Sequence, residues 1–293
     1  MRGSFALRMR KREPKQKKEQ ARNPPVGGQE NGKSLGCALA LLSDTGRVRE
    51  TNQDSVFALV QERICAAGVQ TLGLFMIADG MGGHVGGERA SQLAIWTASQ
   101  NLLREVVLPY ADPAGDGWRA TPITEAIEQA FQEAHRRVQR EVPGGATTLT
   151  VALLMGQRVY VGHAGDCRLY WRHQETLTPL TREHSILSRM IELGQVAADN
   201  SAPAHNDPRR NALYRAVGQP GDLEIDLFSH ALGAGDGLLM CCDGLWASVS
   251  DQEMSAIILQ ADSPAVACRR LVDLANARGG LDNITVLLFD PIG

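Results

Sequence analysis

Five aspartates stand at the ends of apolar runs, where their carboxylates could hold metal ions. Asp79 ends the run LGLFMIAD and Asp243 ends the run GLLMCCD, and a glycine follows each of them. Asp54 precedes one apolar run, Asp282 opens another, and Asp166 lies between two more. Strand ends are rigid, and a neighbouring glycine lets a bound ion approach the backbone. Carboxylates that converge from such positions repel one another unless cations neutralise them.

The ligand chemistry points to hard cations. Oxygen ligands without cysteine or histidine are typical of Mg²⁺ and Mn²⁺ sites. Two such ions can hold a bridging water, lower its pKa and orient it for in-line attack on phosphorus. An Asp-Gly pair is also typical of a tight turn, and we interpret Gly235-Asp236-Gly237 as one. The residues alone therefore indicate a hydrolase with hard metal ions, with a tight turn as the alternative for any single pair.

The elements that must position these carboxylates are short apolar runs interrupted by glycine and aspartate. Gly156-Gln157 separates two runs by a hairpin-length gap, which predicts an antiparallel pair. The strands come in clusters with long helices between them, which favours sheet packed on sheet with helices outside over a regular βαβ alternation. The expected strands are 37–42, 55–60, 72–78, 148–155, 158–163, 167–171, 223–229, 237–242 and 284–289, and the expected helices are 87–107, 123–141, 183–194, 251–261 and 264–278.

The composition limits the class of protein. The chain has 293 residues, of which 43% are hydrophobic and 22% charged, enough for one large domain or two small ones. This balance excludes a chain that is wholly disordered, collagen-like or coiled-coil. No apolar run approaches the ~20 residues of a membrane helix, and the basic start lacks the apolar core of a secretion signal. Six cysteines show no CxxC pair or zinc spacing, so we expect a cytoplasmic protein.

The charge is divided unevenly along the chain. Residues 1–34 hold ten Lys and Arg against three Glu, a net charge of +7, and the remainder holds 20 basic and 30 acidic residues, a net charge of −10. We expect 1–34 to be a disordered basic tail and 35–293 to be one domain. An acidic body suits cations rather than nucleic acid. Contact of the tail with an acidic partner or a membrane surface is the alternative.

Seven segments of the chain resemble, in order, motifs of one family. The segments are Arg49-Glu50-Thr51-Asn52-Gln53-Asp54, Asp79-Gly80-Met81-Gly82-Gly83-His84, Gly145-Ala146-Thr147-Thr148, Gly165-Asp166-Cys167-Arg168, Leu180-Thr181-Arg182-Glu183-His184-Ser185, Cys242-Asp243-Gly244-Leu245 and Asp282-Asn283-Ile284-Thr285. The family that they resemble is the PPM/PP2C group of metal-dependent protein serine/threonine phosphatases, in its compact bacterial form, and the resemblance covers about 36–290. It implies an α+β sandwich of two antiparallel β-sheets flanked by helices on both outer faces, which agrees with the clustered strands.

The resemblance implies a core site for two ions, Mn²⁺ or Mg²⁺. Asp79 would bridge both ions, and the carbonyl oxygen of Gly80 would bind the second. Asp243 and Asp282 would hold the first ion. Asp54 would serve the second, directly or through water.

Two further residues take their roles from the same resemblance. Asp166 would join Asp243 at a third, weaker ion site that is found in bacterial members. Arg49 would grip the substrate phosphate, a role that its planar fork of donors suits.

Several positions depart from the animal members. Gln53 replaces a Glu and cannot be an anionic ligand, which places more weight on Asp54. Met81 stands where those members carry a general-acid histidine and cannot transfer a proton. His84 or a water on a metal is the alternative donor to the leaving oxygen. Glu183-His184 replaces an Asp-His pair and is expected to organise the loop before a polar flap at 195–222.

The resemblance implies hydrolysis of phosphoserine and phosphothreonine in proteins by direct attack of a metal-bridging hydroxide, without a phosphoenzyme. We expect a monomeric enzyme that opposes a cognate bacterial Ser/Thr kinase and binds neither nucleic acid nor membrane. One alternative is a non-catalytic PPM-like module that binds phosphoproteins. Another is a protein that binds nucleic acid through its tail.

Overall fold

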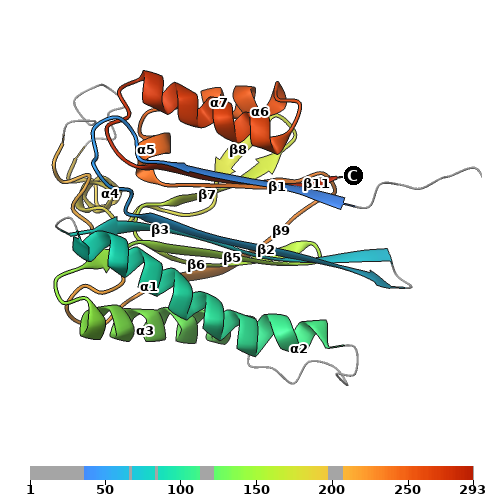
Figure 1. The fold of residues 1–293 in the computed structure, drawn as a ribbon, viewed down its shortest axis with the longest axis horizontal. Coiled ribbons are helices and arrows are strands. Elements are labelled where there is room, and N and C mark those ends of the chain that lie inside the picture. Colours follow the sequence, from blue (N-terminus) through green and yellow to red (C-terminus); the bar gives the residue numbers. More distant parts are fainter. Residues whose placement is uncertain (1–35, 66–67, 83–84, 113–121, 197–206, 293) are drawn as a thin grey trace, which may run out of the picture. The chain divides into compact units, whose positions relative to one another are not determined.

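The computed structural model describes residues 36–65, 68–82, 85–112, 122–196 and 207–292, and the strands within these ranges form two antiparallel sheets (Figure 1). The predicted tail at 1–34 and the histidine at position 84 lie outside the described residues. The first sheet has the order β1 (Gly36–Asp44), β11 (Ile284–Ile292), β10 (Gly237–Cys241), β7 (Arg168–His173) and β8 (Thr176–Pro179). The second has the order β2 (Asp54–Cys65), β3 (Gly68–Met81), β5 (Leu149–Met155), β6 (Arg158–Ala164) and β9 (Asp226–Ala231), and β4 (Ala146–Thr147) pairs with the end of β3.

Helices cover both outer faces of this sandwich (Figure 1). The fold class predicted from the sequence is confirmed. On the second sheet lie α1 (Val85–Leu102), which continues as a π-helical turn η1 (Leu103–Val107) into α2 (Leu108–Ala111), and α3 (Ile123–Glu141). On the first sheet lie α5 (Asp243–Trp246), α6 (Asp251–Leu259) and α7 (Pro264–Ala277), while α4 (Ile186–Glu192) stands apart near one end of the sandwich.

The alternation of side chains along β3 shows how one strand serves two cores. Leu74 and Met76 pack toward the helices, whereas Phe75 and Ile77 pack into the space between the sheets. Successive side chains of a strand point to opposite faces, so a strand covered on both sides must be apolar throughout. Across the inter-sheet core the ring centroids of Phe75 and Phe289 lie 5.1 Å apart.

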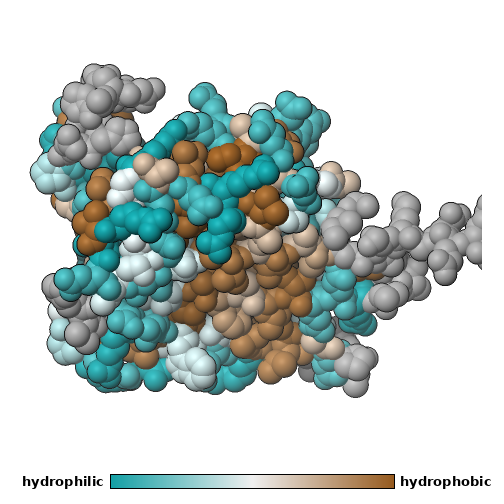
Figure 2. Space-filling view, turned by 45° about the horizontal axis from the view of Figure 1, so that its top comes forward, coloured by the Kyte–Doolittle hydropathy of each residue, from teal (hydrophilic) through white to brown (hydrophobic). Residues whose placement is uncertain are grey.

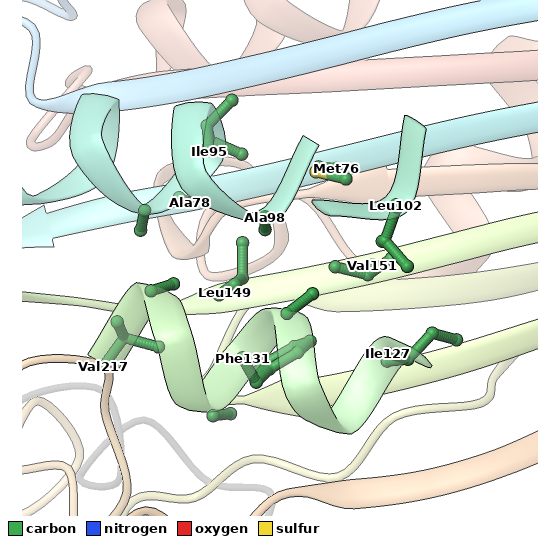
Figure 3. Packing of buried hydrophobic residues seen from close by; sticks show 14 of the residues in the cluster. Met76, Ala78, Ile95, Ala98, Leu102, Ile127, Phe131, Leu149, Val151 and Val217 are labelled. Atoms are coloured by element: carbon green, nitrogen blue, oxygen red, sulfur yellow. The ribbon is translucent and has the colours of Figure 1, made fainter. Parts of the chain in front are cut away.

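The core between the second sheet and its helices includes residues of β3, β5, α1 and α3 (Figure 3). Met76 of β3 and Leu149 of β5 face Phe131 of α3, and Ala98 and Leu102 of α1 close the same layer. All five side chains are fully buried. This packing fixes the ends of β3 and β5, next to which the candidate site lies.

Each sheet has an apolar edge strand whose outer side pairs with no other strand of the described residues. β1 and β2 stand at the ends of their sheets, and apolar side chains of both pack against the inter-sheet core while staying half-exposed. Figure 2 shows hydrophobic residues gathered on this face, below its centre.

Among the described residues no helix combines the length and apolar character needed to cross a bilayer.

Candidate metal centre

A cavity of about 890 Å³ opens at one end of the sandwich and collects most of the predicted site residues. Asp79 lies near the end of β3, Asp243 begins α5 two residues after the end of β10, and Asp282 lies two residues before the start of β11. Asp166 lies in the turn between β6 and β7. The cavity is also lined by Arg49 and Gly80, so six of the seven predicted site residues line one space.

Asp54 is the one predicted ligand that does not line this cavity. It is the direct cross-strand partner of Asp79 in the pairing of β2 with β3. Its Oδ2 accepts a hydrogen bond of 2.6 Å from Thr285 Oγ1, and its buried Oδ1 has no partner among the described residues. The structure therefore places Asp54 beside Asp79 but outside the lining of the cavity.

The end of β3 that carries Asp79 is fixed through its backbone. Its N–H donates to Thr148 Oγ1 at 2.7 Å, and its carbonyl accepts from Thr147 Oγ1 at 2.8 Å. The next residue, Gly80, must be glycine because a Cβ there would lie 2.2 Å from the carbonyl oxygen of Gly87. The first turn of α1 thus lies directly against the strand end, and the aspartate is held in place by rigid neighbours.

Burial and mutual repulsion raise the pKa of several carboxyl groups in the site. Burial raises the pKa of Asp54 to about 7, and the charges of Asp243 and Asp282 add to the effect. Burial and the charge of Asp282 raise the pKa of Asp243 to about 6, although its side chain makes a hydrogen bond with that of Asp79. Burial, with the charges of Asp54 and Asp243, also raises the pKa of Asp79. Close carboxylates of this kind are stabilised when a cation shares them.

Asp282 faces the arginine of the site. Arg49 Nη2 donates to Asp282 Oδ2 at 2.6 Å, with 54% of the arginine side chain exposed. This hydrogen bond and the charges of Asp282, Asp243 and Asp79 raise the pKa of Arg49, although its partial burial opposes them. The guanidinium therefore lies at the mouth of the cavity, next to the acidic groups.

Asp166 is buried, with 7% of its surface exposed. Its carbonyl accepts a hydrogen bond of 3.1 Å from Trp246 Nε1. Burial, followed by the charges of Asp243 and Glu183, raises its pKa. Gly165, just before it, has φ of +119°, a conformation that favours glycine.

The donor set fits a hard divalent cation. Within the described ranges, no three Asp, Glu, His or Cys side chains form a closed set of metal ligands, since Asp282 faces Arg49 and Asp54 faces Thr285. Buried carboxylate oxygens of Asp54 and Asp243 nevertheless lack a partner among the described residues. Orphaned carboxylate oxygens and several close negative charges are what Mg²⁺ or Mn²⁺ would satisfy.

Sequence reasoning assigned no role to Asn283, which organises the loop that carries Arg49. Its Nδ2 donates to the carbonyl oxygens of Thr45 and Thr51, both at 3.0 Å, and its Oδ1 accepts from the N–H of Gln53 at 2.8 Å. The signal was the motif that begins at Asp282, where an amide side chain follows the carboxylate. This buried asparagine ties the loop between β1 and β2 to the start of β11.

Two adjacent arginines of the polar segment 195–222, Arg209 and Arg210, differ in their surroundings. Arg209 is exposed and forms several hydrogen bonds with Asp207. Arg210 lies over the ring of Trp246, with 4.6 Å between the guanidinium carbon and the ring centroid. Its positive charge partly opposes the rise in the pKa of Asp166 and Asp243. Only the second of the pair therefore faces the site.

Comparison with known proteins identifies the family. Residues 47–267 match the sequence model of the family described as Protein phosphatase 2C. The chain belongs to this family. All the predicted ligands of this protein phosphatase 2C chain except Asp282 lie within the matched range.

Relatives of this protein phosphatase 2C chain span nearly the whole of the described region. The serine/threonine phosphatase stp of Listeria welshimeri is 32% identical over 248 residues, which cover 85% of this chain and 93% of that protein. The catalytic domain of the protein phosphatase PstP, solved in complex with two manganese ions, is 32% identical with a TM-score of 0.66 and coverages of 88% and 99%. PppA, described as a key regulatory component of T6SS in Pseudomonas aeruginosa, is 28% identical with a TM-score of 0.67 and coverages of 88% and 99%.

Proposed function

We propose that this protein is a metal-dependent phosphatase that hydrolyses phosphoserine and phosphothreonine in proteins. The observation that carries the proposal is the acidic cavity, in which Asp79, Asp166, Asp243 and Asp282 lie around one space with Arg49 at its mouth. The similarity to serine/threonine phosphatases over most of the chain supports the same reaction. The proposed catalytic domain is 35–293.

The carboxylates would hold the cations and leave one face of the cavity for substrate. Asp79, Asp243 and Asp282, with Asp54 and the carbonyl oxygen of Gly80, are the proposed ligands of two ions, Mn²⁺ or Mg²⁺. Bound ions of this kind neutralise the carboxylates, polarise phosphoryl oxygens and supply a water of lowered pKa as the nucleophile.

Arg49 is the proposed phosphate-binding group. Its guanidinium donates to one carboxylate oxygen of Asp282, and a phosphoryl group offers two oxygens that the guanidinium fork can bind. Exchange of one oxyanion for the other would orient the phosphorus toward the acidic end of the cavity.

No phosphoenzyme is expected from the thiols beside the site. Burial raises the pKa of both Cys167 and Cys242 well above the usual value, so each stays a protonated thiol. Cys242 Sγ also accepts from the N–H of Thr285 at 3.0 Å. We therefore propose water as the nucleophile, which would attack phosphorus while the bond from phosphorus to the serine or threonine oxygen breaks.

The decisive experiment measures Mn²⁺-dependent release of phosphate from a phosphothreonine peptide by the full chain. Asp79→Asn and Asp243→Asn are each expected to reduce the rate about 100-fold or more, because each removes an anionic ligand. Asp273→Asn, on the exposed face of α7, is the matched control and should keep the full rate. Full activity in either site variant would overturn the metal assignment, and Mn²⁺ binding without any turnover would favour the non-catalytic phosphoprotein-binding module.

The proposed partners are phosphorylated proteins and a cognate Ser/Thr kinase whose products the enzyme would dephosphorylate. We place this activity in the cytoplasm, on a monomer. The similarity to serine/threonine phosphatases supports phosphorylated proteins as substrates. The cysteines show no disulfide pattern, which supports the cytoplasmic location.

A further inference from the structure

The turn that carries Asp166 is held by a buried histidine from a distant part of the sequence. The N–H of Gly165 donates to His184 Nδ1 at 3.1 Å. The N–H of His184 donates in turn to the carbonyl oxygen of Gly165 at 2.8 Å, so the two residues are joined twice. His184 is 1% exposed, and it directly precedes Ser185, the N-cap of α4.

These contacts fix the tautomer of the ring. Because Nδ1 accepts a hydrogen bond from Gly165, the proton of the neutral imidazole lies on Nε2. Nε2 then donates to Asp226 Oδ2 at 3.2 Å, and Asp226 Oδ1 accepts from Arg215 Nη1 at 3.0 Å. A carboxylate of β9 therefore orients the ring, and the oriented ring holds the backbone just before Asp166.

Two further aromatic rings contact the ring of His184. The ring centroid of His163 lies 4.8 Å from that of His184, and the ring of Tyr214 lies 5.5 Å away on centroids. The turn itself is tight, because a Cβ on Gly165 would lie 2.5 Å from the side chain of Thr148. Small rotations of the ring would therefore be transmitted to the turn rather than absorbed.

We propose that His184, oriented by Asp226, is a positioning residue that sets the direction of the Asp166 carboxylate toward its cation. This rests on the proposed function, in which Asp166 and Asp243 share the weakest of the bound ions. Trp246 Nε1 holds the carbonyl of Asp166 at 3.1 Å, so His184 and Trp246 fix the backbone on both sides of the ligand. Partners that orient a metal ligand in this way commonly change metal affinity by about 10- to 100-fold when they are replaced.

Two substitutions separate the positioning role from mere packing. In His184→Asn the amide oxygen can stand near the position of Nδ1 and accept from Gly165, whereas in His184→Gln the amide can stand near Nε2 and leaves that N–H without its acceptor. Both remove the same ring from its contacts with His163 and Tyr214. Glu224→Gln is the control, since Glu224 is 76% exposed and its ion pair is with Arg215.

The experiment is Mn²⁺ titration of the full chain by calorimetry, with electron paramagnetic resonance of the free ion as a second readout. Asp166→Asn should remove the weakest binding step. His184→Gln should weaken that step by roughly tenfold or more and leave the tighter steps in place, while His184→Asn and Glu224→Gln stay within about threefold of the wild type.

The possible failures can be told apart. If Asp166→Asn removes the weak step but the Gln and Asn variants bind alike, the positioning role is wrong. If Asp166→Asn leaves every step unchanged, the ligand role of Asp166 is wrong, and phosphopeptide hydrolysis by the same samples tests the phosphatase function separately. If His184→Gln does not fold, His184→Ala takes its place, because it also leaves the N–H of Gly165 without its acceptor, and an unchanged weak step in that variant overturns the inference.

Discussion

The residues of the site oppose one another electrostatically. Asp54 and Asp243 each keep a buried oxygen without a partner among the described residues, and burial raises the pKa of both carboxyl groups. Such an arrangement costs folding free energy, which proteins tolerate where a ligand repays it on binding. Arg49 compensates part of this charge by facing Asp282. Under the proposed function the ion pair would have two competitors, a cation for the carboxylate and a phosphate for the guanidinium.

Arg49→Ala tests the second competition. Loss of the guanidinium should lower kcat/KM for a phosphothreonine peptide by roughly 10- to 100-fold. This range corresponds to the loss of a hydrogen bond to a charged group, which contributes about 1.5–3 kcal/mol. Arg49→Lys should recover only part of this, because an ammonium cannot form the planar fork. Steady-state kinetics and inhibition by inorganic phosphate measure both effects.

Arg47→Ala is the matched control, since this exposed arginine lies on the same loop but does not line the cavity. It should leave kcat/KM within about twofold of the wild type. Unchanged kinetics in Arg49→Ala would remove this residue from the proposed phosphate site.

At the scale of elements, apolar patterning predicted most of the fold. The helix expected over 123–141 is α3 with the same bounds, and the predicted hairpin at Gly156-Gln157 joins β5 to β6. β8 was missed because Thr176–Pro179 is short, polar and defined only by its pairing with β7. The helix expected over 87–107 ends its α-helical part at Leu102, and the apolar periodicity does not reveal the change to π-helical bonding.

The positions of the site aspartates could be predicted from the apolar runs, but the contacts between distant segments could not. The aspartates could be found because each one begins or ends an apolar run. That Asp54 lies opposite Asp79 depends on the register of β2 with β3, which the sequence does not state. The contacts of Asn283 and of His184 join segments far apart in the chain, so no local pattern could show them.

The junction of β3 with α1 gives a test at this scale. A methyl group in Gly80→Ala would lie 2.2 Å from the carbonyl oxygen of Gly87, so strand and helix would have to separate. We expect a loss of about 2–4 kcal/mol in the free energy of unfolding, as for other cases of overpacking or displaced backbone. Urea unfolding in the presence of a chelator measures this without a contribution from bound cations.

Gly86→Ala is the matched control. A Cβ there would lie 3.5 Å from Gly145 Cα and 3.9 Å from Gly145 N, which are ordinary contacts, and alanine favours the helix. Its unfolding free energy should stay equal or rise by up to about 1 kcal/mol. Equal stabilities of the two variants would contradict the close approach at Gly80.

On the scale of the whole molecule, the sandwich brings together chain segments that lie far apart in sequence. The loop between β1 and β2, the end of β3, the turn between β6 and β7, the end of β10 and the start of β11 all meet at the cavity. Antiparallel strands return to the same end with every second connection, so these segments converge although about 230 residues separate Arg49 from Asp282. The cavity thus depends on the packing of both sheets, and its integrity follows the stability of the fold.

The buried imidazole of His163 should make the stability of the fold depend on pH. Burial, with the neighbouring His184, lowers the pKa of His163 to about 3. The unfolded chain has the ordinary histidine pKa of about 6.5, so it binds the proton first. His163 therefore leaves the free energy of unfolding nearly unchanged above about pH 6.5. As the pH falls toward 3, it lowers this free energy progressively, by about 2 kcal/mol at pH 5.

His163→Asn isolates this contribution, because the amide can still meet Thr150 Oγ1, which now lies 2.9 Å from His163 Nδ1. Urea unfolding of both proteins at pH 7, 6 and 5, with a chelator present, cancels the carboxyl groups that they share. The variant should be less stable than the wild type at pH 7, since it leaves a cavity where the ring was. The difference in unfolding free energy should shrink by about 2 kcal/mol on going to pH 5, because only the wild type has a histidine at this position whose protonation stabilises the unfolded chain. A deficit that stays constant across this range would mean that His163 is protonated in the folded protein, with its charge accommodated beside His184.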